Sequence, residues 1–175
     1  MIMEHNGDKV LNLRIGITIY ASQKRAIKKV LSELEERCPT EQILLADVSE
    51  LLISIKGKRG ESDPTALASL VAGDLAASQE IARMTNQYQS CQLILREGQK
   101  TNSFIAEVGP YLVLFAQVST EVPLGWARML ILEASSRIVE IISSRPQITQ
   151  KPEYGLGELK IVNAVDDTFD NLWTT

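Results

Sequence analysis

The stretch DPTALASLVAGDLAASQEIARMTNQY, residues 63–88, decides the fold, because it predicts one long helix with two different sides. Asp63 is a favourable N-cap, and Pro64 suits the first helical position, where its missing N–H would have no intrahelical partner in any case. At about 100° per residue, the apolar positions form a stripe wide enough to lie on a sheet. We expect this core side to contain Leu67, Val71, Leu75, Ser78 and Ala82, flanked by Leu70 and Ile81.

The opposite side of this helix carries small residues where a solvated helix normally carries long charged ones. Its first turns hold Ala66, Ser69, Ala72, Gly73, Ala76 and Ala77, and then Glu80, Arg83, Met84 and Gln87 follow. Either the small residues let another backbone approach closely, or alanine stands there only as the best helix former. Gly73 favours the first interpretation, since glycine inside a helix costs about 1 kcal/mol relative to alanine. We therefore predict a partner-binding surface made of Ala72, Gly73, Ala76, Ala77 and Glu80.

Outward from this helix, apolar periodicity predicts two strands of the domain before it and three after it, in addition to a possible strand in the N-terminal extension. Residues 11–19 alternate in polarity, which is typical of a half-buried strand, and a helix capped by Ser22 follows over 22–37. Further strands are expected over 42–46, 51–55, 91–97, 103–108 and 111–118, and a last helix over 124–143. The strand at 111–118 is apolar on both faces, so it should be central and covered on both sides.

The resulting order of elements predicts an α/β sandwich in the broad sense, with a five-stranded antiparallel sheet and helices packed against it. Residues 20–145 form the predicted domain. Residues 1–19 are an N-terminal extension with a possible strand. Residues 146–175 are expected to be a flexible C-terminal tail, because Pro146, Pro152, Gly155 and Gly157 interrupt any long element.

The tail closes on an acidic-aromatic segment. Phe169, Leu172 and Trp173 are spaced to share one side of a short helix, and Asp166, Asp167 and Asp170 favour the start of such a helix. This segment either docks in a groove of a partner protein or folds back on its own domain, and the residues leave both hypotheses open.

Composition excludes several classes of function. A net charge of −4 provides no basic surface for nucleic acid or an anionic membrane. No apolar run approaches the roughly 20 residues of a membrane span, and residues 1–20 do not resemble a signal peptide, so we expect a cytoplasmic protein. Cys38 and Cys91 are too few for a disulfide scaffold or a zinc site, and His5 is the only histidine. We expect no cofactor, no metal and no catalytic residue.

The order of elements, the motif LASLVAGDLAA at 67–77, the motif PLG at 123–125 and the closing DDTFDNLW at 166–173 together resemble the Roadblock/LC7 family. The resemblance covers the chain from about Ile17 to Trp173. Two departures are a first hairpin turn with Ser49 and Glu50 where the family usually has glycine, and an alternating segment at 11–19 that begins early. Neither departure touches the small-residue surface.

The resemblance implies a sandwich with the long helix on one face of the sheet and two helices on the other. It also implies a homodimer that pairs the long helices and the strand near Cys91 across a twofold axis. Such a dimer is expected to bind a small Ras-like GTPase of the MglA type, in cell polarity or gliding motility, and to stimulate hydrolysis without supplying an arginine finger. The alternative is a non-catalytic scaffold of the same fold, and in neither case is the chain itself an enzyme.

Overall fold

The computed structural model describes residues 11–13, 16–57, 63–86 and 93–144, so the predicted tail lies outside the described residues, as do His5 and Cys91. Two very short strands come first, β1 (Leu11–Asn12) and β2 (Thr18–Ile19). The main elements follow in the predicted order: α1 (Ala21–Arg37), β3 (Thr40–Asp47), β4 (Leu52–Gly57), α2 (Pro64–Met84), β5 (Leu93–Arg96), β6 (Thr101–Val108), β7 (Leu112–Ser119) and α3 (Leu124–Ser143).

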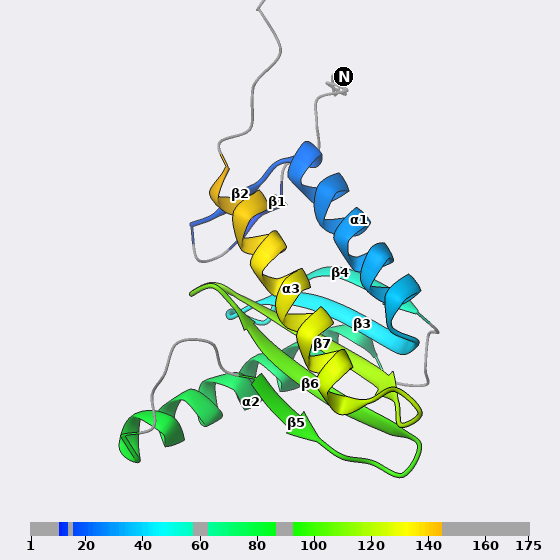
Figure 1. Cartoon of the computed structure of the whole chain (residues 1–175). Coiled ribbons are helices and arrows are strands. Elements are labelled where there is room, and N and C mark those ends of the chain that lie inside the picture. Colours follow the sequence, from blue (N-terminus) through cyan, green and yellow to red (C-terminus); the bar gives the residue numbers. More distant parts are fainter. Residues whose placement is uncertain (1–10, 14–15, 58–62, 87–92, 145–175) are drawn as a thin grey trace, which may run out of the picture.

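The main sheet has five antiparallel strands in the order β4-β3-β7-β6-β5, which confirms the predicted sandwich. Helix α2 covers one face of this sheet, and α1 and α3 lie side by side on the other face (Figure 1). The prediction of a central strand at 111–118 is also confirmed, because β7 lies between β3 and β6.

Two separate hydrophobic clusters explain why β7 is apolar on both faces. Leu112, Leu114 and Ala116 point toward α1 and α3 and join the larger cluster. Val113 and Phe115 point the other way and pack in the cluster beneath α2. Since successive side chains of a strand alternate between faces, a strand covered on both sides must be apolar throughout.

The prediction of a single strand over residues 11–19 is wrong, because the chain reverses between β1 and β2 and the two pair as a small antiparallel hairpin. The Leu13 N–H donates to the Ile17 carbonyl (2.8 Å), and the Gly16 N–H donates to the Leu13 carbonyl (3.1 Å). Gly16 has φ +81°, a conformation that glycine adopts without steric cost. Leu13 and Ile19 are buried in the larger cluster, so this hairpin is packed against the sandwich.

The start of α1 differs by two residues from the predicted one, because Tyr20 rather than Ser22 occupies the N-cap position. The Tyr20 N–H donates to Oε1 of Gln23 (3.1 Å). From the same buried side chain, Nε2 donates to the carbonyls of Ile141 (2.9 Å) and Ser144 (3.0 Å). One glutamine therefore joins the beginning of α1 to the end of α3.

The turn between β3 and β4 forms without the glycine that the resemblance to the Roadblock/LC7 family leads us to expect there. Glu50 takes the left-handed conformation, with φ +74°. Asp47 is fully buried, and its carboxylate accepts hydrogen bonds from Ser49 Oγ (2.9 Å) and the Leu51 N–H (2.8 Å). These bonds support the turn and satisfy a buried charged group that would otherwise be costly.

Candidate functional site

Helix α2 starts as the sequence predicts, and its inner side lies on the sheet. The Asp63 carboxylate accepts a hydrogen bond from the Thr65 N–H (3.0 Å), and Pro64 is the first helical residue. The buried residues of the helix are Ala68, Val71, Ala72 and Leu75, and they pack against Leu44, Ile105 and Phe115 of the sheet.

The expected flanks of this inner side are wrong, because Leu70 and Ile81 are exposed. Their exposed fractions are 72% for Leu70 and 62% for Ile81, and Met84 is 72% exposed. The physical reason is that the contact with the sheet is centred on Ala68, Val71, Ala72 and Leu75. The buried side of the helix is therefore turned toward Ala68 and Ala72, and Leu70 and Ile81 lie on the side away from the sheet.

The predicted partner-binding surface is only partly a surface. Gly73, Ala76, Ala77 and Glu80 are exposed, as that prediction requires, whereas Ala72 is only 5% exposed and belongs to the core beneath α2. The prediction that Ala72 belongs to an exposed surface is therefore wrong. A Cβ added to Gly73 would meet no atom within 4 Å, so packing inside the protomer does not explain a glycine at this position.

The exposed small and large apolar residues form one continuous stripe, which we call the outer face of α2. It consists of Ala66, Leu70, Gly73, Ala77, Ile81 and Met84, which follow one another at spacings of three and four residues. Residues with these spacings lie on one side of a helix. Helix α2 is thus apolar on two opposite sides, a pattern typical of helices buried on both sides. An exposed apolar stripe of this kind indicates a protein contact.

The charged groups beside the outer face are engaged within the protomer. Arg83 Nε donates to Glu80 Oε2 (2.9 Å), and this hydrogen bond holds the pKa of Glu80 below its ordinary value. Arg96 of β5 pairs with Asp74 and so ties the edge strand to α2. The stripe is consequently bordered by neutralised pairs rather than by free charges.

The edge of the sheet next to α2 is also available. Within the described part of the chain, β5 pairs with β6 on one side and with no strand on the other. Its Leu95 is exposed. An unpaired strand edge offers free N–H and C=O groups to another strand.

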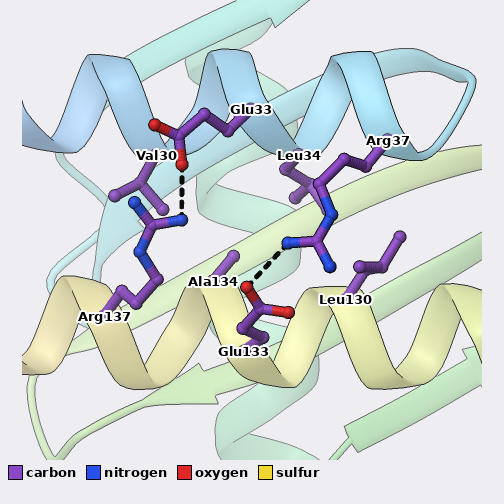
Figure 2. A pocket seen from close by; sticks show the side chains of 8 residues that line it. All are labelled: Val30, Glu33, Leu34, Arg37, Leu130, Glu133, Ala134 and Arg137. Atoms are coloured by element: carbon purple, nitrogen blue, oxygen red, sulfur yellow. Dashed lines mark hydrogen bonds and ion pairs between the residues drawn. The ribbon is translucent and has the colours of Figure 1, made fainter.

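The surface formed by α1 and α3 has a different character. Glu33 accepts from Arg137 (2.6 Å), and Glu133 accepts from Arg37 (2.7 Å), so that two reciprocal ion pairs bridge the helices (Figure 2). The arginine hydrogen bonds lower the pKa values of both glutamates. Beneath the pairs lie the apolar side chains of Val30, Leu34, Leu130 and Ala134. The ion pairs make the middle of this surface polar, whereas Trp126 and Met129 near the beginning of α3 are each 47% exposed.

The described residues contain few groups able to do chemistry. No three His, Cys, Asp or Glu side chains among them lie close enough together to hold a metal ion. The Cys38 thiol is buried, and burial raises its pKa, which keeps it protonated and unreactive. None of the described helices combines the length and the apolar character needed to cross a bilayer.

The structure therefore brings Gly73, Ala76, Ala77 and Glu80 together on one exposed side of α2 and adds residues that sequence reasoning left out. The sequence predicts Leu70 and Ile81 in the core, and the predicted partner-binding surface does not include Met84. Their spacing from Ala66, Gly73 and Ala77 was the signal that could have found them. The predicted tail residues Asp166, Asp167, Phe169, Asp170, Leu172 and Trp173 lie outside the described residues.

Comparison with known proteins identifies the class of fold to which this architecture belongs. No family model and no curated protein sequence matches the chain. The chain has the Roadblock/LC7 fold: a Roadblock/LC7 domain from Streptomyces avermitilis superimposes with a TM-score of 0.55 at 19% identity, covering 65% of this chain and 92% of that one. The resemblance to the Roadblock/LC7 family that the sequence suggested is confirmed.

Within this class, the chain is similar to MglB proteins. Myxococcus xanthus MglB matches with a TM-score of 0.67 at 28% identity, covering 75% of this chain and 98% of that one. The gliding protein MglB of Thermus thermophilus matches with a TM-score of 0.64 at 23% identity, covering 71% of this chain and 93% of that one. Nearly the whole length of both proteins is therefore matched by this chain.

Proposed function

We propose that this chain is an MglB-like regulator that acts in the cytoplasm as a homodimer on a small Ras-like GTPase of the MglA type, in cell polarity or gliding motility. In this role it stimulates hydrolysis by the GTPase and is not itself an enzyme. The observation that carries the proposal is the outer face of α2, where Leu70, Ile81 and Met84 are exposed beside Gly73 and Ala77. The 28% identity to Myxococcus xanthus MglB supports the choice of partner class.

The homodimer accounts for the two exposed features on this side of the molecule. Pairing of β5 with its copy across a twofold axis would continue the sheet and remove its open edge. The same axis would bring two α2 helices onto one face of the joined sheet, where Leu70, Ile81 and Met84 lose contact with water. Burying one such side chain contributes about 1.5–3 kcal/mol, so a few of them suffice for a stable contact.

Of the small-residue surface, Gly73 and Ala77 lie within the outer face that the dimer covers, and Ala76 and Glu80 remain accessible for the GTPase contact. Small side chains allow the partner's backbone to approach closely. Arg83 is held by Glu80 and Arg96 by Asp74, so the basic groups nearest this surface are already engaged. The proposed mechanism is therefore one of positioning: a rigid helical surface fixes the GTPase in the geometry in which its own residues hydrolyse GTP.

The tail adds a second contact with the same GTPase. Phe169, Leu172 and Trp173 would supply apolar anchors, and Asp166, Asp167 and Asp170 would meet basic groups or cap a short helix. A tethered peptide has an effective concentration of roughly millimolar once the main surface is docked, so even weak binding contributes. We expect the tail to adjust affinity rather than to assemble the hydrolytic site.

Release of phosphate from the cognate GTPase, measured with and without this protein, tests the proposal. Acceleration of hydrolysis that saturates with the concentration of the dimer is the expected result. Deletion of residues 166–175 should weaken binding while leaving stimulation at saturation intact. Complete loss of stimulation at saturation would mean that the active surface lies in the tail, and unchanged affinity would mean that the tail makes no contact.

The alternative function, a Roadblock scaffold that binds a GTPase or another partner without accelerating hydrolysis, is separated by the same assay. Binding with an unchanged rate of phosphate release would identify a scaffold. Turnover of a nucleotide by this chain alone would contradict both proposals, since both assign the chemistry to the partner.

A further inference from the structure

An apolar hollow between β5 and the start of α3 is left unused by the contacts proposed above. It encloses about 270 Å³ and is lined by Leu93, Leu95, Phe104, Leu124, Gly125 and Arg128. The hollow exists because α3 packs mainly on β6 and leaves β5 beyond its edge. The side chains of β5 that point away from α2 therefore have no helix above them.

The walls and the rim of this hollow differ in chemistry. Leu95 lies opposite Phe104 in the β5–β6 ladder, and the two form an apolar floor. Arg128 stands at the rim and is exposed. Among the described residues no acidic group lies within 4.0 Å of it, in contrast to Arg37, Arg96 and Arg137, which each form an ion pair. The hollow thus suits an apolar group that carries negative charge beside it.

We infer that, in the absence of the GTPase, this hollow binds the acidic-aromatic segment of the same chain, residues 166–173. Phe169, Leu172 or Trp173 supplies the apolar group. Asp166, Asp167 and Asp170 supply an acidic partner for Arg128, which has none among the described residues. The volume lies just below the roughly 300–1,000 Å³ typical of ligand pockets, which suits one or two side chains rather than a cofactor.

The length of the connection fits this occupant. The hollow lies at the beginning of α3, and the described chain ends just after the other end of this 20-residue helix, a distance of about 30 Å. Residues 145–165 connect Ser144 to the acidic-aromatic segment. A random-coil chain of the same length would have a root-mean-square span of about 25 Å. Effective concentration is greatest when the span of a linker matches the distance between its two sites.

The docked tail has a consequence that rests on the proposed function. The hollow and the GTPase would compete for the same acidic-aromatic segment. In the free dimer, a docked tail would therefore be unavailable for the second GTPase contact. The apparent affinity of the tail contact is then the intrinsic affinity multiplied by the fraction of tails that are released from the hollow.

The docking can be tested on the full-length chain with no GTPase present. The chain has two tryptophans, so incorporation of 5-fluorotryptophan gives two ¹⁹F resonances, one from Trp126 and one from Trp173. We expect the Trp173 resonance to differ from that of a free peptide of residues 164–175. The substitution Arg128→Glu should shift it toward the free position, with a change in the docking equilibrium of roughly two- to fivefold, the size of an exposed ion pair.

Three further variants sharpen the test. Arg25→Glu makes the same change of charge at an exposed position near the beginning of α1, and it should leave the Trp173 resonance unchanged. Phe169→Ala alters only the tail and should release it without affecting the fold of the domain. Replacing Asp166, Asp167 and Asp170 by arginine in the Arg128→Glu background should restore docking, because the charges are exchanged across the contact.

A free-peptide position for Trp173 in the unmodified chain would overturn the inference, and so would equal responses to Arg128→Glu and Arg25→Glu. Because these measurements contain no GTPase, they stand or fall separately from the phosphate-release assay.

Discussion

The α1–α3 surface and the outer face of α2 are both exposed helical surfaces of one sandwich, yet they are built from different residues. Reciprocal ion pairs, Glu33 with Arg137 and Arg37 with Glu133, cover the first. The second carries Leu70, Ile81 and Met84 among alanines and a glycine. Each layer already buries its inner side against the sheet, so the needs of the protomer do not explain the difference. Trp126 and Met129 of α3 are also partly exposed, but Leu70, Ile81 and Met84 are more exposed and lie beside no ion pair between the described helices, so the contrast favours the outer face of α2 as the protein contact.

The largest expected effect comes from placing a charge in the middle of the outer face of α2. Ala77→Arg introduces a guanidinium that a close contact cannot solvate, and we expect it to cost several kcal/mol of association. Light scattering should then give a species near 19.4 kDa rather than twice that mass. Ser136→Arg, at an exposed small residue of α3, is the matched control and should leave the mass unchanged. A dimeric Ala77→Arg variant would show that the outer face is merely exposed.

The next effect separates the two sides of α2. Leu75 is fully buried on the inner side, and Leu75→Ala should lower the free energy of unfolding by about 2–5 kcal/mol through loss of burial and the cavity left behind. Leu70→Ala on the outer side should change it by less than about 0.5 kcal/mol when measured in the Ala77→Arg background, where no dimer contributes. Denaturant unfolding of both variants makes the comparison. Similar losses at the two positions would contradict the assignment of inner and outer sides.

A smaller effect is expected where α1 meets α3. Gln23→Ala removes the donor to the carbonyls of Ile141 and Ser144, and leaving buried polar groups without partners should cost about 1–3 kcal/mol. Thermal unfolding of this variant checks the value, and Lys24→Ala in the same turn of the helix serves as the control. An unchanged unfolding midpoint would mean that water replaces the hydrogen bonds of the Gln23 side-chain amide with no loss of stability.

The smallest effect concerns the ion pairs themselves, since exposed pairs contribute little. Hydrogen bonds from Arg137 and Arg37 lower the folded-state pKa values of Glu33 and Glu133 from the ordinary 4.5. A lowered carboxyl pKa stabilises the fold above the unfolded-state value, and this contribution is lost as pH falls through the folded-state value. The double variant Glu33→Gln, Glu133→Gln should therefore lose less stability than the unmodified chain when unfolding is compared at about pH 7 and well below the ordinary carboxyl pKa. Parallel curves for the two chains would show that the pairs do not persist in solution.

Periodicity predicted most of the fold because burial alone determines it. An eight-residue strand that is apolar on both faces, such as β7, has to be central, and the Asp63-Pro64 pair marked the first residue of α2 correctly. The alternating polarity of residues 11–19 led to a wrong prediction of one strand, because alternation does not detect a reversal of the chain. Gly16 is the residue in this segment that could have indicated the reversal. Polarity failed for Leu70 and Ile81 because it identifies residues that avoid water without telling which molecule covers them. Ala72 shows the converse, since an alanine is equally suited to a surface and to a close contact with a sheet.

The hydrogen bonds of Gln23 also bear on how this domain could be rewired. They hold the backbone at Tyr20, just before α1, close to the backbone at Ser144, just after α3. The two ends of the sandwich domain therefore lie next to each other. Domains whose ends lie this close together tolerate circular permutation. A short glycine-rich joint between those two points, with new ends opened between β4 and α2, would give a permuted chain that begins with α2 and retains every strand pairing of the five-stranded sheet, at the loss of the β1–β2 hairpin and the burial of its Leu13 and Ile19.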